Sequence, residues 1–234
     1  MSVQLPLDIT LRDEATLDRF VVGQNTELIN LINQLGKDQE QMILITGVRG
    51  SGKTHLLQAI SRHSKDAIYL PLAMITTLSP DIFEDLAQRP LVCLDDIQAI
   101  SGNPEMELAL FTLINELKEN GQSFIFTTAS KLDQAGFKLK DLISRLSACT
   151  HYYLEMPDDV HKADYLQEDA RRRGVQINNE VISWILTHTP RDMGSLVALM
   201  RRLDEESLSS QRKITIPFIK QVLENSDNYP VSTN

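Results

Sequence analysis

Residues 47–54 read Gly-Val-Arg-Gly-Ser-Gly-Lys-Thr, and this stretch decides the fold of the chain. An apolar run at residues 42–45 precedes it and reads as a buried strand, while a helical stretch at residues 54–61 follows it. The pattern G-x-x-x-x-G-K-T between a strand and a helix is typical of a loop whose backbone N–H groups surround a polyphosphate. Lys53 then reaches the β- and γ-phosphates, and Thr54 holds Mg²⁺. The sequence therefore predicts a binding site for a nucleoside di- or triphosphate.

The residues expected to contact this nucleotide come from the loop and from the start of the helix that follows. They are Gly47, Gly50, Ser51, Gly52, Lys53, Thr54 and His55.

Two acidic residues follow a second apolar strand. Residues 91–94 read Leu-Val-Cys-Leu and lead directly into Asp95 and Asp96. Ligands of parallel sheets bind beyond the carboxyl ends of the strands. We therefore expect Asp95 to hold Mg²⁺ together with Thr54. Asp96 either orients or deprotonates an attacking water, or it only caps the segment that follows.

Apolar strands alternate with helical stretches over the first two thirds of the chain. Further strands are predicted at residues 67–70, 123–128 and 152–154, and helices at residues 28–35 and 105–119. This alternation predicts an α/β domain with a parallel sheet flanked by helices. After Pro157 the pattern becomes all-helical, with helices predicted at residues 160–173, 179–189, 192–207 and 217–224. We expect a flexible tail at 1–12, the α/β nucleotide-binding domain at 13–157, a small all-helical lid domain at 158–226 and a polar tail at 227–234.

Composition narrows the class of partner. The chain has 234 residues, a net charge of −9 and two cysteines, which we interpret as buried and inert. Its sequence contains neither a membrane-spanning apolar stretch nor a signal peptide, which predicts a cytoplasmic protein with no membrane partner. Proteins that bind DNA through its phosphates usually carry basic surfaces, so an acidic chain with a phosphate loop favours a protein partner. The arginine runs at 171–173 and 201–202 are either a local basic patch or solvated helix faces.

Besides the phosphate loop, short segments at residues 18–23, 94–98, 142–146, 190–193 and 214–218 carry motifs in a defined order. In this order they resemble the AAA+ ATPases, and more closely the branch that contains the bacterial replication initiator DnaA. The resemblance spans roughly residues 17–224 and implies an adenine nucleotide, either ADP or ATP, as the ligand. It implies that Val22 lies in the adenine pocket, that Arg145 is an arginine finger and that Arg191 is the sensor 2 arginine of the lid.

The chain departs from the initiator in ways that bear on its activity. It ends just after the lid, where an initiator would continue into a DNA-binding domain. The segment 72–90 is short and acidic, which is poorly suited to contact single-stranded DNA. Ala129 stands where the initiator has an Asp after the fourth strand. We therefore expect contact with DNA to be indirect and the chain's own turnover of nucleotide to be weak, with the nucleotide acting as a structural ligand.

Residues 4–9, Gln-Leu-Pro-Leu-Asp-Ile, resemble the motif by which partners bind the bacterial DNA sliding clamp, the β subunit of DNA polymerase III. The match is imperfect, and a disordered tail is the alternative interpretation. The resemblance implies that the clamp-binding residues are Gln4, Leu5, Leu7 and Ile9.

Together these resemblances imply a negative regulator of replication initiation. With the sliding clamp, it would stimulate hydrolysis of DnaA-bound ATP by supplying the Arg145 finger in trans, as a monomer or a homo-oligomer. Two alternatives remain: an active AAA+ ATPase of the helicase-loader type, and a clamp-independent adaptor with a vestigial nucleotide site.

Overall fold

A computed structural model describes residues 15–35, 40–64, 66–75 and 79–225 of the chain. The chain divides into two compact units, residues 1–155 and residues 156–234. The clamp-like motif with Gln4, Leu5, Leu7 and Ile9 lies outside the described residues.

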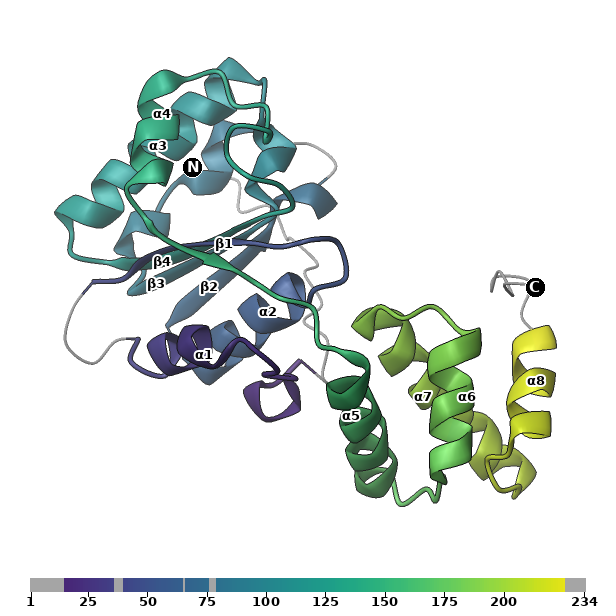
Figure 1. The fold of residues 1–234 in the computed structure, drawn as a ribbon. Helices are drawn as coiled ribbons and strands as arrows, with labels where there is room; N and C mark the ends of the chain where they lie inside the picture. The colour runs from purple at the N-terminus through teal and green to yellow at the C-terminus, as the bar shows by residue number, and fades with distance from the viewer. Residues whose placement is uncertain (1–14, 36–39, 65, 76–78, 226–234) are drawn as a thin grey trace. The chain divides into compact units, whose positions relative to one another are not determined.

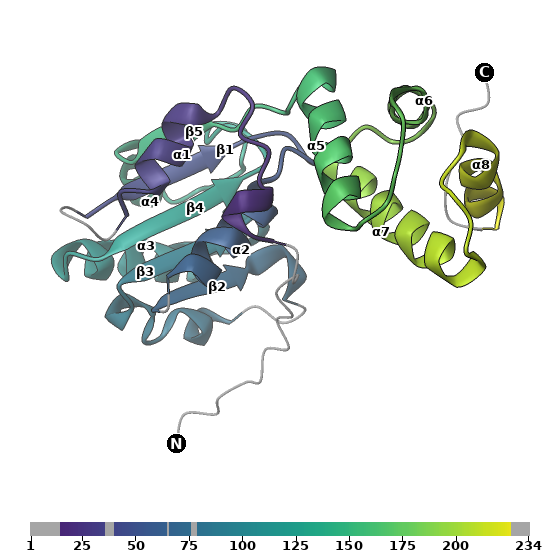
Figure 2. The ribbon, with the colours of Figure 1, turned by 90° about the horizontal axis from the view of Figure 1, so that it is seen from below.

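The first unit is built on a five-stranded parallel sheet. Its strands have the spatial order β2-β3-β4-β1-β5 (Figure 2) and are β1 (Met42–Thr46), β2 (Ala67–Pro71), β3 (Leu91–Asp95), β4 (Ser123–Thr128) and β5 (Thr150–Tyr153). All strand pairs are parallel, so the carboxyl ends of β1, β3 and β4 meet at one edge. This edge is where ligands of such sheets bind.

Helices cover both faces of this sheet (Figure 1). One face packs against α3 (Pro104–Glu119) and α4 (Lys140–Ser147), through strand residues such as Leu44 and Phe126. The other face packs against α1 (Thr26–Ile32) and α2 (Lys53–His63), through residues such as Ile43. Successive strand residues point to opposite faces, so strands covered on both sides must be apolar throughout.

Short 3₁₀ helices occupy several of the connections. They are η1 (Leu17–Arg19), η2 (Leu72–Met74), η3 (Pro80–Phe83), η4 (Leu86–Gln88) and η5 (Ile97–Ile100).

The second unit is all-helical, with α5 (Asp159–Arg172), α6 (Asn179–His188), α7 (Met193–Ser210) and α8 (Ile216–Glu224) around one apolar core. The residue before each helix accepts a backbone N–H from the first turn through its side chain. These capping residues are Asp158, Asn178, Asp192 and Thr215. Such caps satisfy N–H groups that have no partner inside the helix, and they determine where each helix begins.

The structure confirms the predicted fold class, a parallel sheet flanked by helices and followed by a helical lid unit. Some boundaries were wrong. The helix predicted at 28–35 ends at Ile32, because Gln34 and Leu35 close shorter bonds to Leu31 and Ile32. The strand predicted at 152–154 runs from Thr150 to Tyr153, because its polar residues also pair with β1. Helix α4 was not predicted as a helix. Among the described residues, no helix is both long and apolar enough to span a membrane.

Candidate nucleotide-binding site

The phosphate loop depends on glycine at two positions. A Cβ atom on Gly47 would lie 2.7 Å from Ser51 Oγ and 3.0 Å from the Leu154 carbonyl oxygen, so a side chain does not fit there. Gly52 has φ +102°, a conformation that side chains disfavour, and it directly precedes α2. The loop thereby turns into the N-terminus of α2, whose first-turn N–H groups have no acceptor inside the helix and face outward to an anion.

Lys53 lies folded over this loop. Its Nζ donates to the carbonyl oxygens of Gly47 at 2.6 Å and Val48 at 3.1 Å. Burial lowers the pKa of Lys53, while the carboxylates of Asp96 and Asp95 act in the opposite direction. A buried ammonium held mainly by carbonyl oxygens is available to exchange these contacts for phosphate oxygens, which carry more negative charge.

Three hydroxyl groups surround the carboxylate of Asp95, which is 3% exposed. Thr54 Oγ1 donates to Asp95 Oδ2 at 2.6 Å, and the Tyr69 hydroxyl donates to the same oxygen at 3.1 Å. Thr127 Oγ1 donates to Asp95 Oδ1. The pKa of Tyr69 is raised well above its usual value, mainly by burial and to a lesser extent by the nearby carboxylate of Asp95. The structure thus brings together Thr54 and Asp95, which are 41 residues apart in the sequence.

The second acidic residue takes a different place. Asp96 has φ +56°, and its backbone N–H donates to Thr127 Oγ1 at 2.9 Å. It precedes η5, but its side chain makes no capping hydrogen bond to the backbone of that helix. Instead, Asp96 Oδ1 accepts from Gln98 Nε2 at 3.0 Å, and Gln98 Oε1 accepts the backbone N–H of Ala129 at 3.3 Å. Gln98 therefore links the acidic pair to the end of β4.

The residues of the loop fit the phosphates of a nucleotide. Ser51 is 3% exposed, and within the described part of the chain no group hydrogen-bonds to its Oγ. A buried hydroxyl without a protein partner is costly unless another group bonds to it, and a phosphate oxygen is such a group.

The residues also fit a magnesium ion that is bound with a nucleotide. Thr54 Oγ1 and Asp95 Oδ2 are the hard oxygen donors that Mg²⁺ uses, and phosphates and waters commonly complete its coordination. Among the described residues, no group of three or more His, Cys, Asp and Glu side chains is arranged to hold a metal ion. A magnesium ion at this site would therefore need ligands from the phosphates and from water.

The segment expected to form the base pocket lies beside the phosphate loop. The Phe20 ring would be 3.3 Å from a Cβ atom on Gly52, and it lies 6.0 Å from the His55 ring between centroids. His55 Nε2 lies 3.1 Å from the Thr16 carbonyl oxygen, so its ring faces this segment. Val22 is half-buried, and its carbonyl oxygen accepts from Asn25 Nδ2 at 3.0 Å.

Asn25 fixes this segment to the chain just beyond the carboxyl end of β5. Its side chain is 6% exposed and forms two bonds with the backbone of Glu155, donating to the carbonyl oxygen at 3.1 Å and accepting the N–H at 2.9 Å. The two bonds hold the base-side segment next to Glu155, two residues beyond the end of β5.

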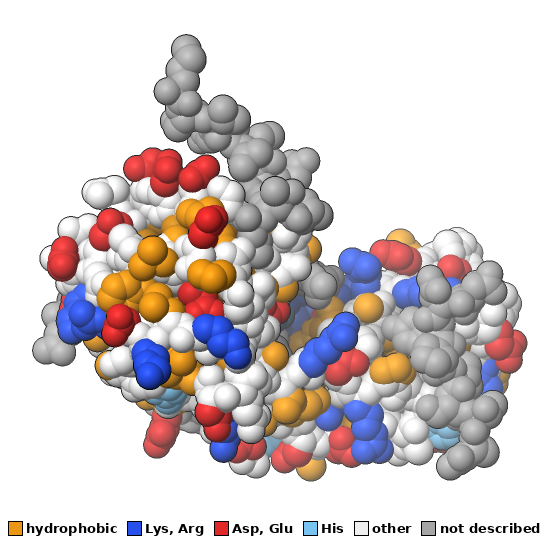
Figure 3. Space-filling model, turned by 90° about the horizontal axis from the view of Figure 1, so that it is seen from above, with side chains coloured by type: hydrophobic (Ala, Val, Ile, Leu, Met, Phe, Trp, Pro, Cys, Tyr) orange, Lys and Arg blue, Asp and Glu red, His pale blue; other side chains and the backbone are white. Residues whose placement is uncertain are grey.

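Arg145 is exposed on α4 of the first unit. Within the described ranges, its guanidinium forms no ion pair and no hydrogen bond. Figure 3 views the side of the first unit where α3 and α4 lie, and apolar side chains gather there. Leu108, on α3, is 56% exposed.

Arg191 belongs to the second unit. Its Nε donates to the Leu186 carbonyl oxygen at 2.8 Å, and its Nη1 lies 3.5 Å from Asp159 Oδ2.

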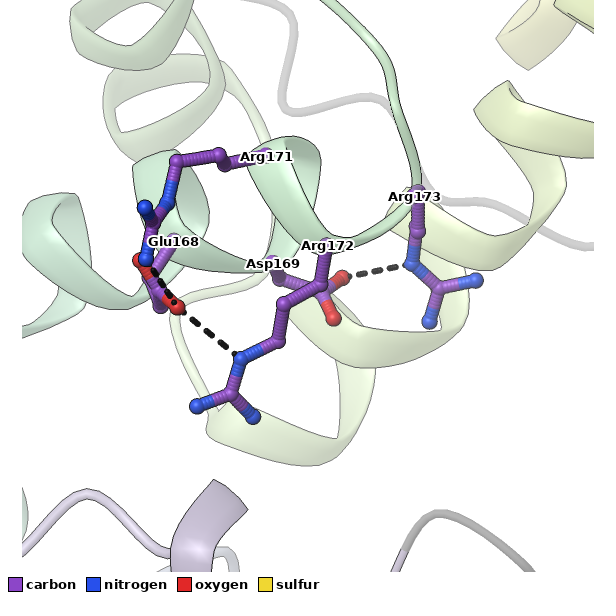
Figure 4. Close-up of polar contacts among 5 residues, drawn as sticks. All are labelled: Glu168, Asp169, Arg171, Arg172 and Arg173. Carbon is purple, nitrogen blue, oxygen red and sulfur yellow. Dashed lines mark hydrogen bonds and ion pairs between the residues drawn. The ribbon is translucent and has the colours of Figure 1, made fainter.

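The arginine run at 171–173 is paired with carboxylates (Figure 4). Glu168 accepts from Arg171 and from Arg172, and these hydrogen bonds, from Arg172 first, hold the pKa of Glu168 below its usual value. Arg173 Nε donates to Asp169 Oδ2 at 2.8 Å. The run is therefore a neutralised helix face and not an open basic patch.

Both cysteines are buried, as expected. Burial raises the pKa of the Cys149 thiol to about 12, and it raises that of Cys93 further. Neither thiol is activated as a nucleophile, which requires a lowered pKa.

Several residues of the site were not found from the sequence: Asn25, Tyr69, Gln98 and Thr127. A weak signal existed for Thr127 and Gln98, since they lie at or just beyond the ends of strands. No local pattern marks Tyr69 or Asn25, because each acts on a residue from another element.

Both units of the chain resemble known proteins. Residues 39–156, about half of the chain, match a family model described as an AAA domain. The chain belongs to the AAA domain family. Residues 159–223 match a second model, described as the lid domain of Hda. An uncharacterized protein of Haemophilus influenzae is 40% identical over 229 residues, which is 95% of this chain and 99% of that protein.

Solved structures share the fold. Domain III of the Thermotoga maritima replication initiation protein DnaA has a TM-score of 0.76 at 18% identity, covering 92% of this chain and 98% of that one. AMPPCP-bound DnaA from Aquifex aeolicus has a TM-score of 0.70 at 20% identity, covering 92% and 71%. The Thermotoga maritima RuvB branch migration motor has a TM-score of 0.69 at 17% identity, covering 92% and 72%. At sequence identities of 17–20%, these similarities show that the fold is shared and nothing more.

Proposed function

We propose that this chain is a nucleotide-bound regulator of replication initiation that acts on DnaA. With the DNA sliding clamp, it stimulates hydrolysis of the ATP that DnaA carries, which prevents re-initiation. The match of the second unit to the Hda lid domain and the DnaA-like fold support this role.

The observation that carries the proposal is the state of Arg145. Its side chain is exposed on α4 and has no ion pair among the described residues, so the guanidinium is available to a partner. An intramolecular salt bridge would occupy this guanidinium, and the described part of the chain contains no salt bridge of Arg145. An arginine presented to a partner's nucleotide stabilises the charge that develops on the transferred phosphoryl group.

The chain's own nucleotide, ADP or ATP with Mg²⁺ at Thr54 and Asp95, acts mainly as a structural ligand in this proposal. Ala129 offers no side-chain polar group at the end of β4, where its backbone N–H bonds only to Gln98 among the described residues. Arg191 contacts the nucleotide as the sensor 2 arginine, and it thereby links nucleotide binding to the position of the lid.

The substitution Arg145→Ala tests the proposed finger. We expect stimulated hydrolysis to fall by about 10³-fold or more, as for other arginine fingers, while clamp binding and nucleotide affinity stay unchanged. The measurement follows labelled ATP on DnaA with clamp-loaded DNA. Lys140→Ala is the matched control, because it removes an exposed cation from the first turn of the same helix. Full stimulation by the Arg145 variant would defeat the proposal.

Deletion of residues 1–10 tests the clamp contact separately. We expect loss of clamp binding together with loss of clamp-dependent hydrolysis, since Gln4, Leu5, Leu7 and Ile9 are removed while the phosphate loop is intact. If the truncated protein still stimulates DnaA in full, the clamp is not the partner that this segment recruits.

A second candidate function is an active AAA+ ATPase of the helicase-loader type. The close contact between Thr54 and Asp95 favours it, because this pair is what a hydrolytic magnesium site needs. Steady-state turnover by the isolated chain separates the two functions. Turnover of about 1 s⁻¹ or faster, in the ordinary range of enzymes, would support the loader, and far slower turnover would support the regulator.

A further inference from the structure

Glu107 is a buried carboxylate outside the nucleotide site. It lies on α3, is 1% exposed, and accepts hydrogen bonds only from backbone N–H groups among the described residues. Gly102 N donates to Oε1 at 2.7 Å, Lys138 N donates to Oε2 at 2.8 Å, and Leu139 N donates to Oε2 at 2.7 Å. Lys138 N also lies 3.1 Å from Oε1.

These bonds join two segments that are distant in sequence. Gly102 lies two residues beyond η5, the 3₁₀ helix that directly follows Asp96. Lys138 and Leu139 end the loop that leads from β4 to α4. Leu139 directly precedes α4, which begins at Lys140. Glu107 therefore fixes the start of α4 to the segment that leaves the acidic pair.

The same loop is attached at its other end and in its middle. Ala129, its first residue, donates its backbone N–H to Gln98. Gly136, with φ +86°, approaches Ser101 so closely that a Cβ atom would lie 3.2 Å from its Oγ. Loop 129–139 thus contacts Gln98 and Ser101, from the segment between β3 and α3, and Glu107 of α3.

A carboxylate at this buried position requires a reason. Burying a charge is costly, and an apolar side chain would fill the space at lower cost. The carboxylate is favoured because it can accept several N–H groups at once, which would otherwise be buried without partners. What it adds beyond packing is a fixed position for the backbone at residues 138 and 139.

We infer that Glu107 is a positioning residue for Arg145: by holding the backbone at Leu139, it fixes helix α4 and so the place from which the guanidinium meets a partner's nucleotide. This inference rests on the finger role proposed above. A helix is stiff over two turns, so a shift at its first residue is carried to Arg145. A displacement of about 1 Å at a catalytic group can cost about 100-fold in rate.

The substitution Glu107→Gln tests this inference in the full chain. Gln keeps the size of the side chain but places an amide NH₂ group against a backbone N–H. We expect faster hydrogen–deuterium exchange of residues 136–147, unchanged exchange in α2, and unchanged nucleotide affinity. Stimulated hydrolysis should fall about 10- to 100-fold. Ile32→Ala is the control, because it removes packing in α1 on the opposite face of the sheet. Ile32→Ala should lower the melting temperature but change neither the hydrogen–deuterium exchange of residues 136–147 nor the stimulated hydrolysis.

Arg145→Ala separates this inference from the function on which it rests. That variant should lose stimulation while its exchange at residues 136–147 stays as in the wild type, and adding Glu107→Gln should cause little further loss of activity. If Arg145→Ala keeps stimulation, the proposed function fails. If Arg145→Ala loses stimulation but Glu107→Gln keeps it in full, the positioning role fails alone.

A measurement on the wild type guards against a variant that does not fold. The amides of Gly102, Lys138 and Leu139 should exchange slowly even though they lie in connections between elements. Exchange as fast as in an exposed loop would overturn the inference.

Discussion

Thr127 joins the two acidic residues at the carboxyl edge of the sheet. Its Oγ1 donates to Asp95 Oδ1 and accepts the backbone N–H of Asp96 at 2.9 Å, and its side chain is fully buried. A single hydroxyl uses its donor and one of its acceptor sites here. It therefore fixes both the carboxylate of Asp95 and the left-handed backbone conformation of Asp96.

The isosteric change Thr127→Val should lower the free energy of unfolding by about 1–3 kcal/mol, because it leaves a buried N–H and a buried carboxylate oxygen without this partner. Urea unfolding followed by circular dichroism measures the loss. Thr112→Val is the matched control, since Thr112 is exposed on α3 and bonds only locally, to the Leu108 carbonyl oxygen. Its effect should stay within about 0.5 kcal/mol. Equal effects of the two substitutions would contradict the role assigned to Thr127.

At the scale of elements, α5 illustrates how a run of like charges is tolerated. Arg172 and Arg173 lie four residues after Glu168 and Asp169, a spacing that places each pair on one face of the helix. The pairs differ in burial. Asp169 and Arg173 have side chains that are 2% and 10% exposed, while Glu168 lies at the surface. Buried pairs lose most when one partner is removed, and exposed pairs contribute little.

Asp169→Asn should therefore destabilise the second unit by about 3 kcal/mol, the low end of the range for breaking a buried pair, because Asp204 remains 3.5 Å from Arg173. Differential scanning calorimetry or urea unfolding measures the loss. Glu168→Gln, which removes a charge one residue earlier, should leave the stability nearly unchanged. A larger loss from Glu168→Gln than from Asp169→Asn would show that burial does not decide the strength of these pairs.

At the scale of the whole molecule, charge limits what the chain can bind. The net charge is −9, and the arginine run at 171–173, one of two that could have formed a local basic patch, is paired with carboxylates. Binding to nucleic acid through phosphates requires unpaired cations that release counterions. These charges support the proposal of a protein partner over a DNA strand.

The isolated chain should accordingly show no binding to a labelled single-stranded oligonucleotide in fluorescence anisotropy at 50 or 200 mM salt, with dissociation constants weaker than about 10⁻⁴ M. Adding clamp-loaded DNA should produce association, and deletion of residues 1–10 should abolish it. Tight, strongly salt-dependent binding by the isolated chain would instead indicate a basic surface and favour the loader-type function.

Local patterns in the sequence were sufficient for the class of fold and for the place of the glycine-rich loop between β1 and α2. Apolar runs of strand length, separated by helical periods, dictate a parallel sheet covered on both faces. The spacing of Gly47, Gly52, Lys53 and Thr54 dictates a loop around an anion, because these requirements concern neighbours along the chain. Short or polar elements were harder to predict: α4 was missed and β5 was misplaced, since their residues are ordered by packing and by pairing with β1.

The tertiary structure alone decided which side chains meet. The strand order places β3 between β2 and β4, so Tyr69 and Thr127 come to lie beside Asp95 from elements 26 and 32 residues away. Glu107 reaches Lys138 and Leu139 across 31 and 32 residues in the same way. Such contacts depend on the register of strands and on how helices pack on the sheet. The sequence by itself determined that the chain has a phosphate loop in an α/β fold, and packing determined the hydroxyls around Asp95 and the buried carboxylate that holds α4.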